Sequence, residues 1–208
     1  MLETKIASAA DVERLAATLT DAFADDPLSR WMTPAHGYPG RLTHLFRFLL
    51  SDGVSRAVVD TLAGGPDIAL AGAAIWTRPG QWKVPGTTLV RNAGLIARAS
   101  GMRLPRLIGR LTQLEHLHPT EPAHWYLQVL GVACDHRGRG LGSALLSSRL
   151  AQLDEQQVPA YLESSNPRNL SLYQRHGFTI TKEVAFRHGP PQWLMWREPR
   201  PRQARTDA

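Results

Sequence analysis

Apolar residues recur every three to four positions in five stretches of the chain, which is the spacing of a helix with one buried face. The predicted helices cover residues 12–23, 40–50, 104–117, about 140–155 and 167–175. Asp11 is the candidate N-cap of the first helix, and Pro27 ends it because proline disfavours helix in the residue before it. Pro105 suits the first turn of the third helix, and Gly177 is the expected end of the last.

Shorter apolar runs between turn residues predict strands. They cover residues 5–8, 57–61, 68–77, 124–132, 159–164, 178–186 and 193–197. The run 124–132 is apolar on both faces, as is typical of a central strand. Strands that give way to alternating helices and strands predict an α/β fold, in which helices flank a mixed β-sheet. We expect residues 1–198 to form a single domain and residues 199–208 to be a disordered tail.

Composition narrows the class of protein. The chain has 208 residues, 43% of them hydrophobic and 20% charged, which suits one domain with a sizeable core. Its one cysteine, Cys134, excludes an internal disulfide and fits a reducing compartment. The N-terminus lacks a signal-peptide pattern, and no apolar run reaches membrane-spanning length. We therefore expect a cytoplasmic protein with no membrane partner.

The net charge is +6, and arginine accounts for 21 of the 24 basic residues. A basic excess is compatible with nucleic acid, acidic lipid or a phosphorylated cofactor. A solvated helix face and a loose basic tail explain it better than DNA binding, because no aromatic residues alternate with these arginines and no nucleic-acid-binding motif occurs. We expect no nucleic-acid partner, although the positive field would help to collect an anionic coenzyme.

The run Val129-Leu-Gly-Val-Ala-Cys-Asp-His-Arg-Gly-Arg-Gly-Leu-Gly142 leads from the central strand through a glycine-rich loop into a helix. Its last three glycines permit backbone conformations closed to other residues, and their N–H groups can converge on an anion. The N-terminus of the following helix adds unpaired N–H groups and a partial positive charge. Arg137 and Arg139 place two cations beside the loop. A tight turn in which glycine only relieves steric strain is the alternative for such a loop taken alone.

Two familiar phosphate loops do not match this run. The dinucleotide fingerprint requires its third glycine where Ser143 stands, and the nucleoside-triphosphate loop requires Gly-Lys-Ser/Thr, which the chain lacks. The pattern Arg/Gln-x-x-Gly-x-Gly/Ala after a strand does match, from Arg137 to Gly142. The loop thereby resembles the acetyl-CoA pyrophosphate loop of the GNAT superfamily of N-acetyltransferases.

A second segment, residues 161–178, strengthens this resemblance. Asn166 before Pro167 is a good helix N-cap, and Tyr173 lies two turns after it on the same side of the helix. Asn169 lies one turn before Tyr173. Taken singly, Asn166 is explained as a cap and Tyr173 as a half-buried aromatic residue. The joint pattern of Asn, Tyr and Gly-Phe after the glycine loop is similar to the helix that follows the fifth strand in GNAT enzymes.

Further short segments resemble the puromycin N-acetyltransferase-like subgroup of this superfamily. They are Ala22-Phe-Ala-Asp-Asp-Pro27, Ile75-Trp-Thr77, Glu121-Pro-Ala-x-Trp125, Tyr161-Leu-Glu-Ser-Ser165 and Pro167-Arg-Asn-Leu170. The similarity covers most of the chain and is weakest over residues 80–118. It indicates a subgroup better than it indicates a substrate.

The resemblance implies direct transfer of an acetyl group from acetyl-CoA to an amine, without a metal. Contacts with acetyl-CoA are implied for Leu130, Gly131, Val132, Arg137, Gly138, Arg139, Gly140, Leu141, Gly142, Ser143, Asn166 and Asn169. Leu130–Val132 match a bulged strand end, and the N–H near Leu130 would bind the oxyanion. Tyr173 matches the general acid, because a phenol with a reference pKa of about 10 stays protonated at neutral pH.

The group that removes the proton from the amine is left open. Glu163 is the first candidate, and its alternative role is a strand-end carboxylate that orients substrate or pairs with an arginine. His124 is the second candidate, since histidine titrates near neutral pH. His116 and His118 are expected to be exposed loop residues. Cys134 stands where the family usually has proline. A thiol near a thioester could form a covalent acyl-enzyme, but we favour the simpler interpretation that Cys134 is only a small residue at a strand end.

Candidate acceptor-binding residues lie between the first two predicted helices. Asp25, Asp26, Arg30 and Trp31 would attract a cationic amine, with His124 as a further contact, or they are helix-end and turn residues. The expected function is an N-acetyltransferase for a small-molecule amine, such as an aminonucleoside or another antibiotic-like amine, acting as a monomer or homodimer. The alternatives are a protein or peptide N-acetyltransferase and a non-catalytic acyl-CoA-binding sensor.

Overall fold

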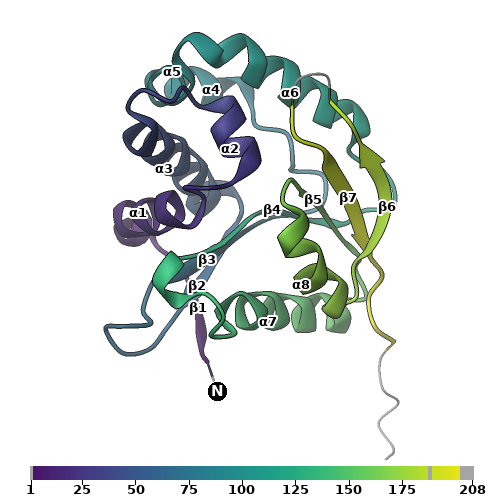
Figure 1. Cartoon of the computed structure of the whole chain (residues 1–208). Helices are drawn as coiled ribbons and strands as arrows, with labels where there is room; N and C mark the ends of the chain where they lie inside the picture. Colours follow the sequence, from purple (N-terminus) through teal and green to yellow (C-terminus); the bar gives the residue numbers. More distant parts are fainter. Residues whose placement is uncertain (1, 187–188, 202–208) are drawn as a thin grey trace, which may run out of the picture.

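The computed structural model describes residues 2–186 and 189–201, and one seven-stranded sheet runs through them in the order β1-β2-β3-β4-β5-β7-β6 (Figure 1). The strands are β1 (Thr4–Ile6), β2 (Val58–Leu62), β3 (Gly72–Thr77), β4 (Trp125–Val132), β5 (Ala160–Ser164), β6 (Thr179–Val184) and β7 (Gln192–Arg197). Neighbouring strands are antiparallel except β4 and β5, which are parallel. The predicted mixed sheet flanked by helices is therefore confirmed.

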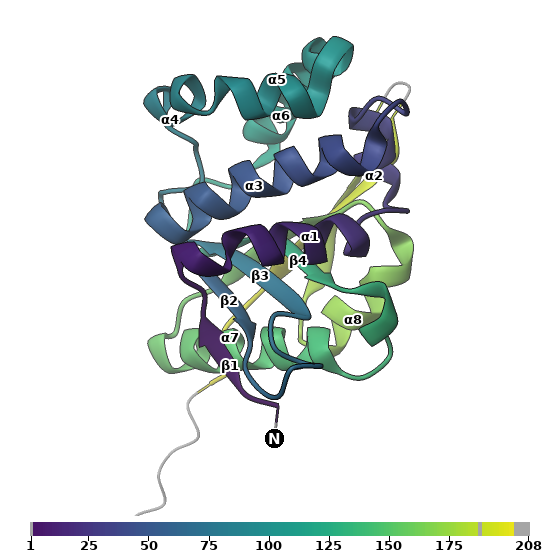
Figure 2. The same cartoon turned by 90° about the vertical axis from the view of Figure 1, so that its left-hand side faces the viewer.

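Helices cover both faces of this sheet. They are α1 (Val12–Ala22), α2 (Pro27–Met32), α3 (Tyr38–Arg56), α4 (Gly86–Arg91), α5 (Ala93–Ser100), α6 (Leu104–Leu117), α7 (Leu141–Gln156) and α8 (Leu170–Arg175). Short 3₁₀ turns are η1 (Ala9–Asp11), η2 (Gly101–Arg103), η3 (Cys134–His136) and η4 (Pro167–Asn169). Helices α1 and α3 pack on one face and α7 on the other, while α4 to α6 form a further layer outside α3 (Figure 2).

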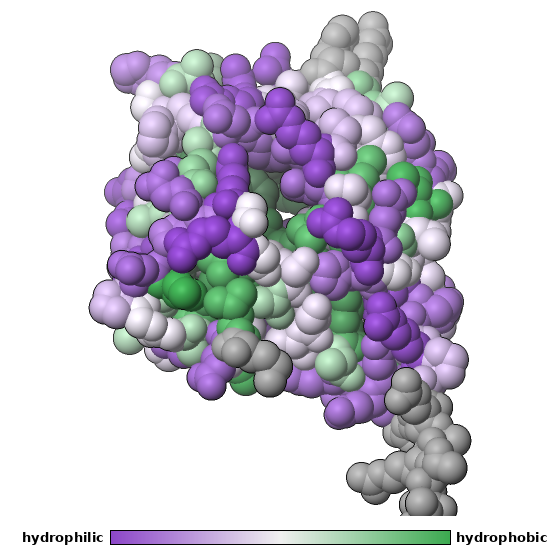
Figure 3. All heavy atoms as spheres, turned by 60° about the horizontal axis from the view of Figure 1, so that its bottom comes forward, coloured by the Kyte–Doolittle hydropathy of each residue, from purple (hydrophilic) through white to green (hydrophobic). Residues whose placement is uncertain are grey.

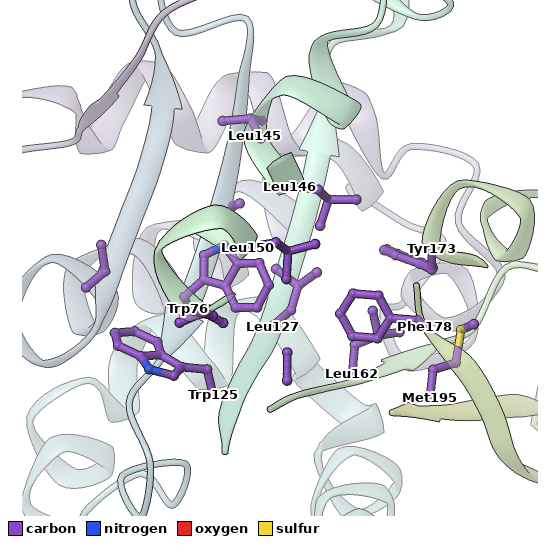
Figure 4. Packing of buried hydrophobic residues seen from close by; sticks show 14 of the residues in the cluster. Trp76, Trp125, Leu127, Leu145, Leu146, Leu150, Leu162, Tyr173, Phe178 and Met195 are labelled. Atoms are coloured by element: carbon purple, nitrogen blue, oxygen red, sulfur yellow. The ribbon is translucent and has the colours of Figure 1, made fainter. Parts of the chain in front are cut away.

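The apolar core is divided by the sheet into two clusters. On the α7 side, leucines of the helix meet the aromatic and apolar side chains of the strands and of α8 (Figure 4). On the other side, Leu15 and Leu19 of α1 and Leu42 and Phe46 of α3 pack over Ile75 of β3. Burial on both faces holds the middle strands in place through close packing.

A buried ion pair fastens α7 to the sheet. Arg149 of α7 donates two hydrogen bonds to the Asp60 carboxylate of β2, at 2.9 and 2.6 Å, and both side chains are less than one-tenth exposed. The two parallel bonds fix the direction of the guanidinium as well as its position. The N-terminal end of α7, which follows the glycine loop, is thereby held relative to the strands.

The central strands β4 and β5 separate after three residue pairs. Trp125, Tyr126 and Leu127 pair with β5, whereas the rest of β4 pairs only with β3 among the described residues. Across that second pair, Ile75 lies opposite Val129 and Trp76 opposite Leu127, so Gln128 is an extra residue in a β-bulge. A bulge bends its strand and increases the local twist. The resemblance implied a bulge at residues 130–132, near the end of the strand, whereas this bulge lies two residues earlier, where β4 and β5 cease to pair.

Several element predictions need correction. Helix α6 has the predicted limits, but α4 and α5 were not predicted, and α3 is longer than expected because Gly53 near its end packs against Val59 and Ile75 without ending the helix. Asp11 occupies the predicted N-cap position of α1, but its side chain makes no capping hydrogen bond to that helix. It closes a capping box in which its carboxylate accepts hydrogen bonds from the backbone N–H and the hydroxyl of Ser8.

The predicted tail, residues 199–208, lies only partly in the described region. Residues 202–208 are outside it. The backbone N–H of Arg200 donates to the Asp154 carboxylate at 2.8 Å, so the beginning of this segment is tied to α7. In the described ranges no helix is long and apolar enough to cross a membrane, and no group of three or more His, Cys, Asp or Glu side chains is arranged to hold a metal ion.

Candidate functional site

A cavity of about 620 Å³ lies beside the end of β4, beyond the residues that pair with β5. Its walls are the end of α1, the end of β4, the glycine loop with the first turn of α7, and the segment from Asn166 to Arg175. Figure 3 shows a hollow near the centre of the face drawn there, with apolar surface inside it. The lining includes the predicted residues Asp26, Leu130, Gly131, Val132, Arg137, Gly138, Gly140, Leu141, Gly142, Ser143, Asn166, Asn169 and Tyr173.

The glycine loop owes its shape to two residues. Gly138 and Gly140 have φ angles of +74° and +79°, a region in which a residue with a Cβ is strained. Gly140 is the N-cap of α7, and the first-turn N–H groups of that helix have no carbonyl partners within it. Since residues 140–143 all line the cavity, these donors and the positive end of the helix dipole lie at its wall.

Basic residues surround the same wall. Arg137, Arg168 and Arg175 line the cavity. The Arg137 guanidinium donates to the carbonyl of Ala22 at 2.7 Å, so it also ties the loop to the end of α1. Arg139 does not line this cavity. It lines a neighbouring hollow of about 500 Å³ together with Arg14 and residues at the turn that precedes β3.

The open side of β4 contributes backbone groups. Residues Leu130, Gly131 and Val132 lie beyond the last pair with β5, and on their other side they pair with β3. Gly131 is required here because a Cβ would lie 2.7 Å from Leu19 and 2.8 Å from Phe23 of the α1 region. The unpaired strand edge is suited to an extended ligand that hydrogen-bonds as an additional strand would.

Tyr173 projects from α8 to the cavity and is 7% exposed. Burial raises the pKa of its phenol above the usual value of about 10, and the negative charge of Asp26 raises it further. Asp26 is the N-cap of α2, where its carboxylate accepts from the N–H of Ser29 at 2.8 Å and from the hydroxyl of Ser165 at 3.1 Å. The expected helix-end role of Asp26 is thus present, and the same carboxylate borders the cavity.

Asn166 and Asn169 both line the cavity from the segment that leads into α8. The Asn166 side chain accepts from the N–H of Arg168 at 3.1 Å, which confirms the predicted N-cap. Asn169 lies one turn before Tyr173, so the two side chains lie on the same side of this helical segment.

A second group of polar side chains, which we call the Glu163 cluster, consists of Glu163, Tyr126, Tyr161, His118 and His124. It lies on the face of β5 opposite Leu162, which packs in the α7-side core. The phenols of Tyr126 and Tyr161 donate to the two oxygens of Glu163 at 2.9 and 3.0 Å. Burial and the adjacent carboxylate raise the pKa values of both phenols. The Glu163 side chain is 6% exposed and does not line the coenzyme-sized cavity.

The two histidines extend this cluster in one direction. His124 Nδ1 lies 2.8 Å from the carbonyl of Pro122 and must donate to it, because a carbonyl only accepts. Burial lowers the pKa of His124, so its ring is neutral and its Nε2 accepts from His118 Nε2, 3.2 Å away. His118 Nδ1 then faces Glu163 at 3.8 Å. A proton placed between these two atoms would be shared by a histidine and a carboxylate.

His118 is not the exposed loop residue that the sequence predicts. It directly follows α6, is 6% exposed, and stacks on Trp82 with ring centroids 4.0 Å apart. His124 is also buried, and its ring contacts that of Trp196 edge-on at 5.0 Å. Aromatic rings therefore exclude water around the imidazoles, which is the cause of the lowered pKa of His124.

Of the other predicted acceptor-side residues, Asp25 lines the cavity, whereas Arg30 and Trp31 do not. Arg30 forms an exposed ion pair with Asp25 at 3.1 Å and lies over the ring of Tyr38. The backbone carbonyls of Arg30 and Trp31 both accept from Arg103, at 2.9 and 2.8 Å, which fixes α2 against the segment that precedes α6. The Trp31 ring lies next to Gly189. These contacts give Arg30 and Trp31 structural partners.

Sequence reasoning missed Arg168 and Arg175 at the cavity, and His118 in the Glu163 cluster. The two arginines are seven residues apart, which is the spacing of one helix side, so helical periodicity around Tyr173 was the available signal. No local pattern marks His118, because its neighbours come from β4 and β5. Cys134 lies at the end of β4, where its thiol donates to the carbonyl of Asp21, and burial raises the pKa of that thiol.

The sequence model described as "Acetyltransferase (GNAT) family" matches residues 82–178, which include β4, the glycine loop and α8. An uncharacterised N-acetyltransferase of Schizosaccharomyces pombe is 25% identical over 95% of this chain and 84% of its own length.

Solved structures with the same fold cover nearly the whole chain. One from Corynebacterium glutamicum, described as histone acetyltransferase HPA2 and related acetyltransferase, is 25% identical with a TM-score of 0.72, over 96% of this chain and 97% of its own. Arylalkylamine N-acetyltransferase 2 from Aedes aegypti has a TM-score of 0.68 at 13% identity, over 96% of this chain and 99% of its own. The latter likeness is one of fold alone.

Proposed function

We propose that this chain, whose residues 82–178 match the acetyltransferase (GNAT) family model, transfers the acetyl group of acetyl-CoA to the amine of a small molecule. The observation that carries the proposal is the cavity beside the end of β4, with a glycine loop and helix N-terminus at one wall and a buried tyrosine at another. We also propose that residues 2–198 act as one domain, since a single sheet joins their ends.

The fit of acetyl-CoA to the cavity rests on three features of this chain. The first-turn N–H groups of α7 and the left-handed glycines offer donors to a pyrophosphate, and a Cβ at Gly138 or Gly140 would occupy open space beside them. Arg168 and Arg175 supply positive charge. The unpaired edge at residues 130–132 offers strand-type hydrogen bonds to an amide-containing arm. Acetyl-CoA supplies the acyl group as a reactive thioester.

Two chain groups act on the acyl end. The N–H near Leu130, on the unpaired strand edge, stabilises negative charge on the carbonyl oxygen. Tyr173 gives its proton to the sulfur as the carbon–sulfur bond breaks. Because burial and Asp26 raise the pKa of Tyr173, the phenol is fully protonated at neutral pH and is available as the acid.

Glu163 and His118 together take the proton that the amine loses as its nitrogen bonds to the acetyl carbon. The carboxylate faces His118 Nδ1 at 3.8 Å, and the buried, neutral His124 keeps the bare nitrogen of His118 on that side. The proton is thereby held between two acceptors in a site with little water. Glu163 thus serves as the first proton acceptor, and His124 orients His118 without contacting the reacting atoms.

The experiment is a measurement of thiol release from acetyl-CoA with a panel of amines. The panel contains puromycin, aminoglycosides, polyamines, amino acids and short peptides, and the thermal stabilisation by acetyl-CoA is measured first. We expect stabilisation and selective turnover of one small-molecule class. Turnover of peptides alone would replace the proposal with a peptide N-acetyltransferase, and stabilisation without any turnover would favour an acyl-CoA sensor.

Tyr173→Phe tests the acid directly. We expect kcat to fall about 100- to 10,000-fold while the Kd of acetyl-CoA is unchanged, as for loss of one general acid. Tyr38→Phe is the matched control, because it removes a phenol that donates to the carbonyl of Phe23 rather than one at the acyl end. Equal kcat in the Tyr173→Phe enzyme and the native enzyme would remove Tyr173 from the mechanism.

A further inference from the structure

Arg110, on α6, is a buried cation that the fold leaves with too few partners. Its side chain is among the largest fully buried ones, and the residue is 2% exposed. Its Nε and Nη1 have no hydrogen-bond partner among the described residues, and Nη2 has one long contact of 3.4 Å with the carbonyl of Pro190. A guanidinium buried in this way normally lies against a carboxylate or phosphate.

Arg110 lies against an aromatic ring rather than against the carboxylate of an internal ion pair. No carboxylate of the described residues lies within 4.0 Å of it, while the ring of Phe186 lies against the guanidinium, 3.1 Å from ring centroid to carbon. Burial lowers the pKa of Arg110 to about 10, and the charge of Glu163 opposes that shift. The charges of Arg110 and Glu163 thus interact favourably, although the two side chains form no ion pair.

Gln192, at the start of β7, is a second unpartnered polar group. It is 2% exposed, and its Oε1 has no hydrogen-bond partner in the part of the chain that the structure describes. On β7 it alternates with Trp193 and Met195, which pack in or against the α7-side core, so it belongs to the face that carries Glu163. Two buried groups without partners on one side of the sheet mark a place that a polar ligand would complete.

We propose that Arg110 binds an acidic group of the acceptor, so that the acceptor is an amine that also bears a carboxylate. This inference rests on the proposed acetyltransferase function and adds the substrate class. Glu163 receives the amine end and Arg110 the carboxylate end, with Gln192 as an additional amide contact. The rings of Tyr126 and Tyr161 beside Glu163, and the ring of Phe186 against Arg110, would exclude water from both charges.

The test compares amines in pairs that differ only in the carboxylate. The pairs are L-phenylalanine with 2-phenylethylamine, L-leucine with isopentylamine, and the dipeptide Gly-Phe with its amide. We expect kcat/KM to be at least tenfold higher for the acid in one or more pairs, through a lower KM. Acetylation with no preference for the acid in any pair would overturn this inference and leave the acetyltransferase function standing.

Arg110→Met supplies the second readout. We expect the ratio of kcat/KM between acid and matched amine to fall at least tenfold, with Arg110→Lys in between. Arg106→Met is the control, because Arg106 is exposed one turn earlier on the same helix. Methionine removes an unpaired buried charge, so Tm should stay or rise. A lower Tm with equal loss for both members of a pair would assign Arg110 a packing role and overturn the inference.

A binding measurement separates this inference from the proposed function. N-acetyl-L-phenylalanine and N-acetyl-2-phenylethylamine are titrated calorimetrically into the native and Arg110→Met proteins, without acetyl-CoA. We expect the acid to bind at least tenfold more tightly to the native protein and to lose this advantage in the variant. If no amine is acetylated but this difference is found, the proposed function fails and the carboxylate site stands. Equal binding of the two probes overturns the site.

Discussion

The cavity beside β4 presents mainly backbone groups, whereas the Glu163 cluster consists of side chains. The cavity is lined largely by two contiguous segments, residues 130–143 and 166–175, and its chemistry comes mainly from backbone N–H groups. The Glu163 cluster is made of side chains from the end of α6, from β4 and from β5, which are far apart in the sequence. A binding site made of backbone N–H groups tolerates side-chain substitutions that leave φ unchanged. A site made of side chains loses a functional group with each substitution.

This difference predicts that the two regions can be disabled separately. Changes in the glycine loop should weaken acetyl-CoA binding and spare the response to the acceptor. Changes in the Glu163 cluster should do the reverse. A substitution that disables one region should therefore leave the other one working.

The largest expected effect is on the acceptor side. Glu163→Gln keeps the size of the side chain and removes its charge, so kcat should fall about 100- to 10,000-fold at neutral pH. The Kd of acetyl-CoA should not change. Steady-state kinetics and calorimetry measure the two quantities, and Glu183→Gln is the control because Glu183 is exposed on β6. A loss of acetyl-CoA affinity equal to the loss of kcat would contradict the separation of the regions.

A smaller effect is expected on the coenzyme side. Gly140→Val forces a β-branched residue into a left-handed conformation at φ +79° and disturbs the N-terminus of α7. We expect the Kd of acetyl-CoA to rise about 10- to 100-fold, which corresponds to about 1.4 to 2.8 kcal/mol. Gly94→Val, at an open helix position with no atom within 4 Å of an added Cβ, is the control. Unchanged affinity in Gly140→Val would exclude this loop as the binding element.

Acidification should act on the Glu163 cluster through His124. Burial lowers the folded-state pKa of His124. As the pH falls below about 6.5, His124 is therefore protonated in the unfolded chain before it is protonated in the folded protein, and this favours unfolding. This stability contribution is present above that pH and is lost as the pH falls toward the folded-state pKa. The slope is at most about 1.4 kcal/mol per pH unit for one group.

The measurement is the free energy of unfolding between pH 7 and pH 5. His124→Asn should show a shallower decline than the native protein, and His36→Asn, at an exposed position, should not. Some slope will remain, because burial also lowers the pKa of His44. A slope that is identical in the native protein and His124→Asn would mean that another group controls the acid sensitivity.

The smallest expected effect is at Cys134, which lies close to the cavity without a role in either region. Burial raises the pKa of its thiol, so little thiolate forms at neutral pH and a covalent acyl-enzyme is disfavoured. Cys134→Ala should leave kcat/KM within about twofold. Mass spectrometry of the native protein after incubation with acetyl-CoA should detect no acetylated Cys134. An acetyl adduct there together with a large loss of activity would reverse this view.

Local patterns predicted much of the fold and one of the two regions. Helix α6 has the limits expected from its leucine spacing and Pro105, and the loop from Arg137 to Ser143 lies at the cavity except for Arg139. Helices α4 and α5 were not predicted, since each is short and carries few buried residues. His118 was predicted to be exposed because nothing next to it in the chain indicates that Trp82 stacks on it.

The sequence by itself determined the glycine loop, the N-cap at Asn166 and the placement of Tyr173 on a helix, because these depend on φ angles and hydrogen bonds between near neighbours. The tertiary structure alone decided that Glu163 meets His118, that Arg110 is buried with no counter-charge from the described residues, and that Arg139 faces a different hollow. Those contacts require strand pairing, the bulge at Gln128 and the docking of α6, and no local rule encodes where segments so distant in the chain meet.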